Sequence, residues 1–160
     1  MLREFVEQKH YLFTDHIDTW QDAIRMSCKS LIADGTVDES YPEEIVRCVT
    51  KYGPYIIIMP MVAMPHSSEN AKGVNKTSIG FMKVEDPVHF DPEDPEKDAK
   101  LFFTLAACDS SQHMDNMARL SEMLCNEDLV NELLEAKGPD DLLKLQEKYL
   151  DNNEGGNENT

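Results

Sequence analysis

The first part of the chain contains two stretches in which apolar residues recur at helical spacing. In residues 17–32 they are Ile17, Trp20, Ile24, Cys28, Leu31 and Ile32. This spacing places them on one face of a helix, and Gly35 supplies a stop. Ser40 and Glu43 have the spacing of a capping box, which predicts the start of a second helix, and Gly53-Pro54 ends it. Two consecutive helices are therefore expected before residue 55.

Three apolar runs are typical of strands. Residues 55–59 are wholly apolar, rich in isoleucine and followed by a proline, which fits a strand buried on both faces. Residues 77–84 and 101–108 are the other two strand candidates. Between them, residues 85–98 carry seven acidic side chains and three prolines. We expect this segment to be an exposed connection that holds at most a short edge strand around Val88-His89-Phe90.

Helical patterns return after residue 108. Asp109, Ser110 and Ser111 supply capping side chains for a helix with an apolar inner face. The inner residues are Met114, Met117, Leu120, Met123 and Leu124. Asn126 caps a further helix, and Pro139 opens a last one that runs through residue 150. Residues 151–160 have no apolar side chain, which predicts a disordered acidic tail.

Helices interleaved with short apolar strands indicate an α/β (α+β) fold. The 160 residues fit one domain, since domains cluster near ~100–150 residues. We therefore expect a single domain over residues 1–150, followed by the tail.

The net charge limits the classes of partner that the protein is expected to bind. The chain has 15 basic and 31 acidic side chains, a formal charge of −16. This argues against binding to nucleic acid and to anionic membranes, because both depend on Lys and Arg. No apolar run approaches the ~20 residues that span a bilayer, and no signal-peptide pattern opens the sequence. We expect a cytoplasmic protein whose protein partners present neutral or basic surfaces.

The four cysteines lack CxxC spacing, so we expect reduced thiols that pack as small apolar side chains. The sequence contains no P-loop, GxGxxG, GxSxG or HExxH motif. A zinc site that combines the histidines with Asp109 or Cys108 is a weaker alternative, and so is a Cys108 nucleophile beside His113.

Two of the five histidines follow strand candidates directly. His66 comes after Pro65, at the end of the apolar segment, and His113 lies in the first turn of the helix after residues 101–108. If the two strands are parallel, both imidazoles emerge at the same edge of the sheet. The remaining histidines, which we expect at the surface or as capping residues, are His10, His16 and His89.

A pair of imidazoles beside a helix N-terminus is suited to phosphate. The first-turn amides and the positive end of the helix dipole attract anions. Neutral imidazole is a nucleophile near pH 7, because its ordinary pKa is ~6.5. One histidine would carry a phosphoryl group, and the other would donate a hydrogen bond to its oxygens.

The same blocks resemble a known family. The segments GPYIIIMPMVAMPHS, KTSIGFMKVEDPVHF and LFFTLAACDSSQHMDNMARLSEML are similar to enzyme IIA domains of the mannitol–fructose type, from the bacterial sugar phosphotransferase system. The ascorbate-specific branch shares the Gly-Pro-Tyr start, the Ala-x-Pro-His end and the Gln-His block. The resemblance covers roughly residues 20–150 and implies a mixed sheet flanked by helices.

The resemblance also implies a role for each histidine. His66 would accept a phosphoryl group from the histidine-containing phosphocarrier protein and pass it to a cysteine of the cognate enzyme IIB, while His113 supports it. No metal or organic cofactor is implied, and the membrane permease IIC would be a separate chain. The alternative is a regulatory module of the same fold that senses phosphorylation. The oligomeric state stays open, a homodimer included.

Two departures from the family pattern concern the loop near His66. Similar proteins often have glycine in place of Met61, which matters if the backbone there needs a positive φ. They often have arginine after the histidine, where this chain has Ser67-Ser68. We expect Met64 and Ser67 to contact the phosphate or a partner, with Met59 and Met61 divided between the core and a docking surface.

Overall fold

The computed structural model describes residues 1–67 and 72–151 of the chain. Its centre is a five-stranded sheet with the order β1-β4-β5-β3-β2. The strands are β1 (Tyr11–Thr14), β2 (Ile57–Met59), β3 (Met61–Ala63), β4 (Ser78–His89) and β5 (Asp98–Ala106). The pairs β1–β4 and β3–β5 are parallel, whereas β4–β5 and β2–β3 are antiparallel. The expected α/β (α+β) fold with one mixed sheet is confirmed.

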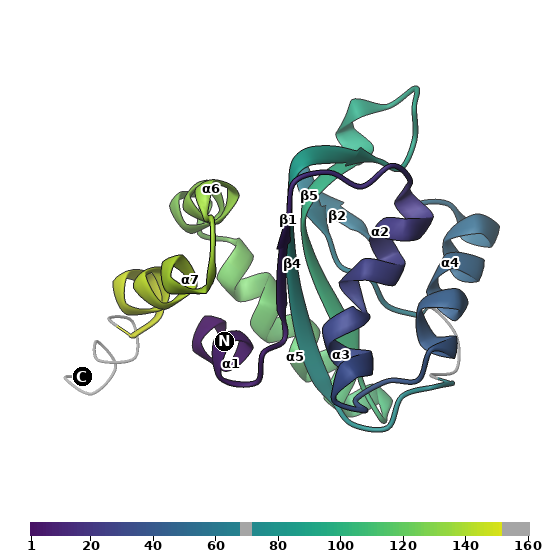
Figure 1. The fold of residues 1–160 in the computed structure, drawn as a ribbon, viewed down its shortest axis with the longest axis horizontal. Coiled ribbons are helices and arrows are strands. Elements are labelled where there is room, and N and C mark those ends of the chain that lie inside the picture. The colour runs from purple at the N-terminus through teal and green to yellow at the C-terminus, as the bar shows by residue number, and fades with distance from the viewer. Residues whose placement is uncertain (68–71, 152–160) are drawn as a thin grey trace.

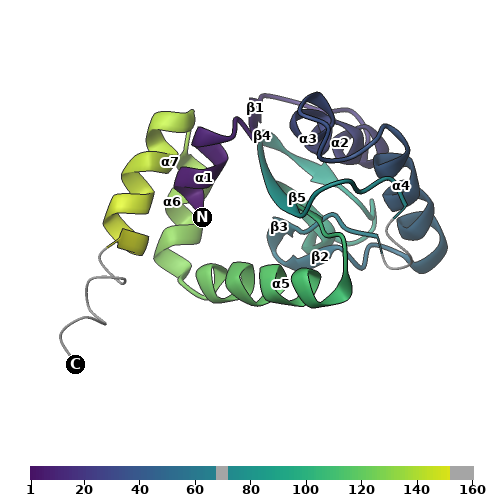
Figure 2. The ribbon, with the colours of Figure 1, turned by 90° about the horizontal axis from the view of Figure 1, so that it is seen from below.

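Helices cover both faces of the sheet (Figures 1 and 2). One face carries α2 (Trp20–Ser27), α3 (Lys29–Ala33) and α4 (Ser40–Tyr52). The other carries α1 (Leu2–Glu7), α5 (Ser110–Leu124), α6 (Glu127–Glu135) and α7 (Pro139–Leu145). A π-helical segment, Gln146–Asp151, continues α7, and a 3-10 turn, Pro95–Lys97, precedes β5.

Each face of the sheet has its own apolar core, because successive residues of a strand point to opposite faces. In β5, Phe102 packs on the side of α2 to α4, whereas Phe103 packs on the side of α1, α5 and α6. Gly80 in β4 allows a close approach of α3: a Cβ there would lie 3.3 Å from Cγ of Leu31.

A lysine is buried on the side of the sheet that α1, α5 and α6 cover. The Lys83 side chain is 0% exposed, and its Nζ donates to Glu85 Oε1 at 2.8 Å and to the Ala136 carbonyl at 2.7 Å. Ala136 directly follows α6, so Lys83 ties the end of that helix to β4. Lys137 binds the other oxygen of Glu85 at 2.9 Å. Lys83 and Lys137 together lower the pKa of Glu85 to about 2.

The first and last described segments lie against each other. The backbone N–H groups of Leu2 and Arg3 donate to Oε1 of Gln146 at 3.0 and 3.3 Å. Arg3 also forms an ion pair with Asp151. The sequence assigns Asp151 to the acidic tail, but in the structure it closes the Gln146–Asp151 segment. The rest of the predicted tail, residues 152–160, lies outside the described residues.

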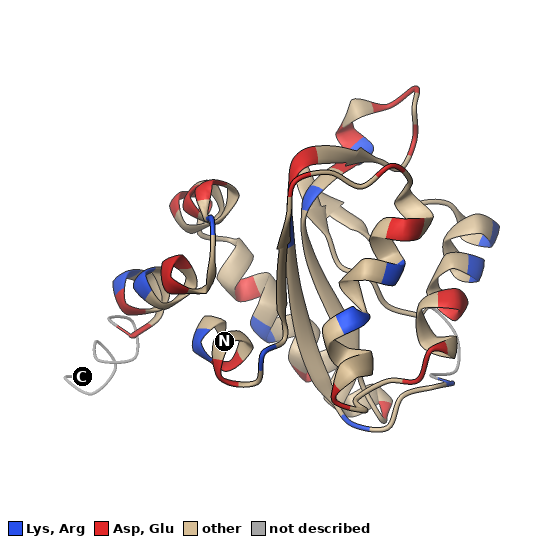
Figure 3. Cartoon of the chain, viewed as in Figure 1, with Lys and Arg blue, Asp and Glu red and all other residues tan. Residues whose placement is uncertain are grey.

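Acidic side chains occur on both helical layers and on the connection between β4 and β5 (Figure 3). That connection was predicted too long, because β4 continues to His89, which pairs with Asp98 of β5. β5 then runs away from the acidic connection and ends at Ala106, so α5 begins at the opposite end of the sheet.

The prediction for residues 55–59 was also wrong. The strand in this segment, β2, lies at the edge of the sheet, and Ile58 is 40% exposed. The inner strand is β3, which begins after Pro60 and pairs with β5. A turn at Pro60 and Met61 therefore divides the apolar segment into an edge strand and an inner strand.

The helix predictions need smaller corrections. The helix expected over residues 17–32 is interrupted at Cys28, and Ser40 lies inside α4, whose N-cap makes no side-chain hydrogen bond. Met114 is 69% exposed, so it does not belong to the inner face of α5. The Asn126 cap is confirmed, since its side chain accepts from the Leu129 amide. The sequence pattern did not predict α1 and β1.

Candidate functional site

The two histidines that follow strands meet at one edge of the sheet. β3 and β5 are parallel, and the pairing extends past β3, because the Leu105 amide donates to the Pro65 carbonyl at 2.9 Å. His66 is the next residue. β5 leads into α5, whose first turn carries His113. The two ring centroids are 5.3 Å apart, with the ring planes inclined at 43°. The expected convergence of the two imidazoles is therefore present.

A hydrogen bond fixes the tautomer of His66. Its Nδ1 lies 2.6 Å from the backbone carbonyl of Met64. A carbonyl can only accept, so Nδ1 carries the proton and Nε2 keeps its lone pair in the neutral ring. Burial is the largest influence and lowers the pKa of His66, the bond to Met64 opposes this, and the charge of His113 lowers it further. The result is a neutral imidazole with a nucleophilic Nε2 at neutral pH.

The start of α5 orients His113. Asp109 caps the helix, as predicted: its Oδ1 accepts from the Gln112 amide at 2.8 Å, and its carbonyl accepts from the His113 amide at 3.1 Å. Burial lowers the pKa of His113 as well. Asp109 thus occupies the amides of Gln112 and His113, which leaves the amides of Ser110 and Ser111 as the first-turn donors for an anion at the start of α5.

Thr77 anchors the loop before α5, a role that the sequence did not predict. The Cys108 amide donates to Oγ1 of Thr77 at 3.0 Å. The Thr77 hydroxyl in turn donates to Oε1 of Gln112. The residue that precedes β4 therefore fixes both the approach to α5 and its first turn, and with them the place of His113.

Comparison with known proteins identifies the family. The sequence model described as "Phosphoenolpyruvate-dependent sugar phosphotransferase system, EIIA 2" matches residues 4–149. The chain belongs to this family. The resemblance expected from the sequence is confirmed, and the EIIA chain is a phosphotransferase component that transfers phosphoryl groups between proteins of a sugar phosphotransferase system.

Relatives named for two sugars match this EIIA chain. It is 35% identical over 126 residues to the mannitol-specific cryptic phosphotransferase enzyme IIA component of Escherichia coli K12, which covers 79% of this chain and 84% of that protein. It is 31% identical over 109 residues to the ascorbate-specific EIIA component of Shigella boydii serotype 4, with 68% and 70% covered. The crystal structure of a PTS IIA domain from Streptococcus pyogenes M1 GAS superposes with a TM-score of 0.80 at 27% identity, covering 92% and 94%.

The other candidate contact residues of the EIIA chain differ in placement. Met64 is 1% exposed, so its side chain belongs to the core, and the prediction of a phosphate or partner contact is wrong for it. Ser67 is half-buried, with its Oγ 3.9 Å from Sγ of Cys48. Met59 and Met61 are half-buried. Ser68 lies outside the described residues.

Each of the remaining three histidines lies beside a carboxylate. His10 is 3% exposed, with Nε2 2.5 Å from Asp34 Oδ2, so the surface prediction is wrong for it. His16 and His89 are exposed and lie beside carboxylates, His89 with its Nδ1 2.8 Å from Oδ1 of Asp98.

No metal site or membrane span is found in the described part of the EIIA chain. In residues 1–67 and 72–151, no three His, Cys, Asp or Glu side chains are grouped as a metal ion would require. No helix in these ranges has the length and apolar character to cross a membrane. All four cysteines are free, with Cys28 and Cys48 buried and Cys108 and Cys125 exposed.

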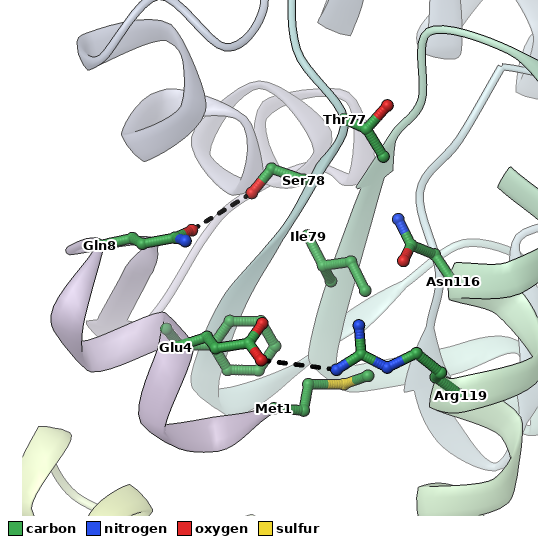
Figure 4. A pocket seen from close by; sticks show the side chains of 9 residues that line it. Met1, Glu4, Gln8, Thr77, Ser78, Ile79, Asn116 and Arg119 are labelled. Carbon is green, nitrogen blue, oxygen red and sulfur yellow. Dashed lines mark hydrogen bonds and ion pairs between the residues drawn. The ribbon is translucent and has the colours of Figure 1, made fainter. Parts of the chain in front are cut away.

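A separate polar pocket opens between α1, the start of β4 and α5 (Figure 4). Its volume is about 130 Å³, and Asn116 and Arg119 of α5 face Glu4 and Gln8 of α1 across it. Neither His66 nor His113 lines this pocket.

Proposed function

We propose that this EIIA chain carries a phosphoryl group on Nε2 of His66. The observation that supports the assignment is the ring pair, in which Nδ1 of His66 is committed to a carbonyl and His113 lies 5.3 Å away, centroid to centroid. Nε2 is then the ring nitrogen with a free lone pair, at the position where a second imidazole and helix amides meet the phosphoryl oxygens.

The donor we propose is the phosphorylated histidine-containing phosphocarrier protein. The Nε2 lone pair of His66 attacks phosphorus, a new P–N bond forms, and the donor's P–N bond breaks with its electron pair returning to the donor ring. The proton on Nδ1 stays in place through its bond to Met64, so the step needs no net proton transfer. His113 donates a hydrogen bond to a phosphoryl oxygen and stabilises the charge.

The acceptor we propose is a cysteine thiolate of the cognate enzyme IIB, with the permease IIC as a separate membrane chain. The sulfur attacks phosphorus, a P–S bond forms, and the P–N bond to His66 breaks. The mannitol enzyme IIA of Escherichia coli, which shares the fold at a TM-score of 0.74, has been solved in complex with phosphorylated enzyme IIB. We propose that both transfers take place in the cytoplasm.

The names of the relatives point to two different sugars. Relatives named for mannitol and for ascorbate both match, so the similarity does not favour ascorbate. The regulatory alternative uses the same acceptor histidine and differs only in the later fate of the phosphoryl group. A second copy of the chain is not required for the chemistry, because both histidines come from one chain.

Labelling with phosphorylated carrier protein tests this proposal. We expect His66→Gln to lose all acid-labile label, and His113→Ala to accept label but release it slowly to enzyme IIB. His16→Gln, at an exposed site beside two carboxylates, is the matched control and should behave as wild type. Full labelling of His66→Gln would refute the acceptor assignment. Label that never reaches enzyme IIB would favour the regulatory module.

A further inference from the structure

Two tyrosine hydroxyls hold the peptide group that joins His66 to Ser67. The Tyr55 hydroxyl donates to the carbonyl of His66, on one side of the peptide. On the other side, hydrogen bonding from the backbone of Ser67 acts on the Tyr41 hydroxyl and lowers its pKa. Tyr41 also donates to the Leu105 carbonyl at 2.6 Å, which anchors it to the end of β5. Tyr55 therefore fixes the carbonyl of this peptide group, and Tyr41 interacts with its other side.

This peptide lies just beyond the support of the sheet. The residue before it, Pro65, is still bound to the sheet, because its carbonyl accepts from the Leu105 amide. Within residues 1–67 and 72–151, the backbone of His66 has no backbone partner. A residue one step past a strand is free to rotate unless side chains hold it. The two tyrosines replace the strand partner at the position where the reacting ring begins.

Tyr55 also contacts the imidazole itself. Its ring meets the ring of His66 edge-on, with the centroids 5.2 Å apart and the planes at 88°. The hydrogen bond from Nδ1 to Met64 restrains one edge of the imidazole, and Tyr55 restrains its side. Because the ring has two rotatable bonds, fixing the peptide and both ring contacts leaves a single orientation for Nε2.

The buried Tyr41 hydroxyl can act as hydrogen-bond donor and acceptor at the same time. The side chain is 2% exposed. Burial is the largest influence and raises the pKa of Tyr41, while the bond from Ser67 opposes it. The hydroxyl therefore stays protonated, donating to Leu105 and accepting from Ser67 at the same time.

We propose that Tyr41 and Tyr55 are positioning residues that hold the orientation of His66 for phosphoryl transfer, and with it the contact of Nδ1 with the Met64 carbonyl that fixes the tautomer. The inference rests on the proposed role of His66. Phosphoryl transfer depends on in-line placement of the nucleophile, and a misplacement of about 1 Å can cost on the order of 10²-fold in rate. Neither tyrosine reacts; each acts through the backbone or ring of the histidine.

The test compares three Tyr→Phe variants of the full chain. Tyr55→Phe and Tyr41→Phe each remove one hydroxyl from the His66–Ser67 peptide, and Tyr52→Phe, at a 52% exposed side chain at the end of α4, is the control. We expect the first two to accept the phosphoryl group from the carrier protein between about tenfold and 10²-fold more slowly, while reaching full labelling. Tyr52→Phe should match wild type.

Nitrogen-15 NMR of the His66 ring separates positioning from mere stability. We expect the wild-type Nδ1–H tautomer to give way to a mixture of tautomers in Tyr55→Phe, in protein that remains folded by circular dichroism. An unchanged tautomer in folded Tyr55→Phe overturns the proposal, whether the rate is wild type or reduced. If Tyr41→Phe unfolds, the rate and the tautomer of the Tyr55→Phe variant, at a half-buried position, test the proposal. The tautomer is measured without phosphate, so this test can fail or succeed independently of the labelling test of His66→Gln.

Discussion

The backbone of Met61 lies in a conformation that favours glycine, and this gives a prediction with a defined sign. Met61 follows Pro60 in the turn between β2 and β3, and its φ is 68°. Proline followed by a residue with positive φ is the pattern of a type II turn, where glycine is preferred at the second position. The pairing of β3 with β5 also shifts register between Met61 and Val62. A methionine at this position therefore carries backbone strain that a glycine would not.

The strain is measured by comparing Met61→Gly with Met61→Ala. Both variants lose the half-buried side chain, so that loss cancels. Alanine keeps a left-handed penalty of about 1–2 kcal/mol, which glycine avoids. Glycine loses about 0.5–1 kcal/mol through the greater freedom of its unfolded chain. The difference leaves Met61→Gly more stable than Met61→Ala by roughly 0.5–1 kcal/mol.

Urea denaturation followed by circular dichroism measures this difference. With a slope of about 1–3 kcal/mol per molar urea, it moves the midpoint by several tenths molar. Met59, which pairs with Val62 and has no positive φ, is the matched control. There the order should reverse, with Ala more stable than Gly by about 0.5–1 kcal/mol. Finding Met61→Gly less stable than Met61→Ala would refute the reasoning.

Three further predictions concern pH, a buried lysine and a helix cap. Because the pKa values of His66 and His113 are lowered, the rate of phosphoryl acceptance should stay constant at pH values just below the ordinary histidine pKa of ~6.5. The free energy of unfolding should fall as the pH drops below that value, since the unfolded chain binds those protons first. NMR titration midpoints of the two rings above ~6.5 would contradict this. Lys83→Met leaves the buried Ala136 carbonyl unpaired and should cost about 1–3 kcal/mol in urea unfolding, so wild-type stability would count against it. Asp109→Ala should cost about 1 kcal/mol and slow labelling, and Asp109→Asn should restore both; equal losses in the two variants would exclude capping as the cause.

The histidine pair could be predicted because its placement depends on local signals. His66 and His113 each follow an apolar run closely, and Asp109 is a strong capping residue for the helix that carries His113. Parallel pairing of β3 with β5 then brings the two ends together, whatever the rest of the sheet does. The sequence could not show the tyrosines, since their hydroxyls reach backbone groups that are 11 and 64 residues away.

The sequence-based predictions were wrong where the local pattern does not determine the position of a residue in the fold. Residues 55–63 are almost continuously apolar, and periodicity does not distinguish an edge strand from an inner one in such a run. The turn that separates them depends on a positive φ at Met61, which a methionine does not signal. His10 is buried and binds Asp34, 24 residues later, through a contact that no spacing rule predicts. α1 and β1 are too short to show a period.

The segments around Leu2 and Gln146 contact each other, so the fold does not depend on the order of its elements along the chain. With Leu2 bound to Gln146, a covalent link between these two segments would replace a junction that already exists. New ends could then be opened in the acidic connection before Asp98, at the end of the sheet remote from the paired imidazoles. A circularly permuted chain of this kind would keep every element beside its present neighbours while changing which strand is synthesised first.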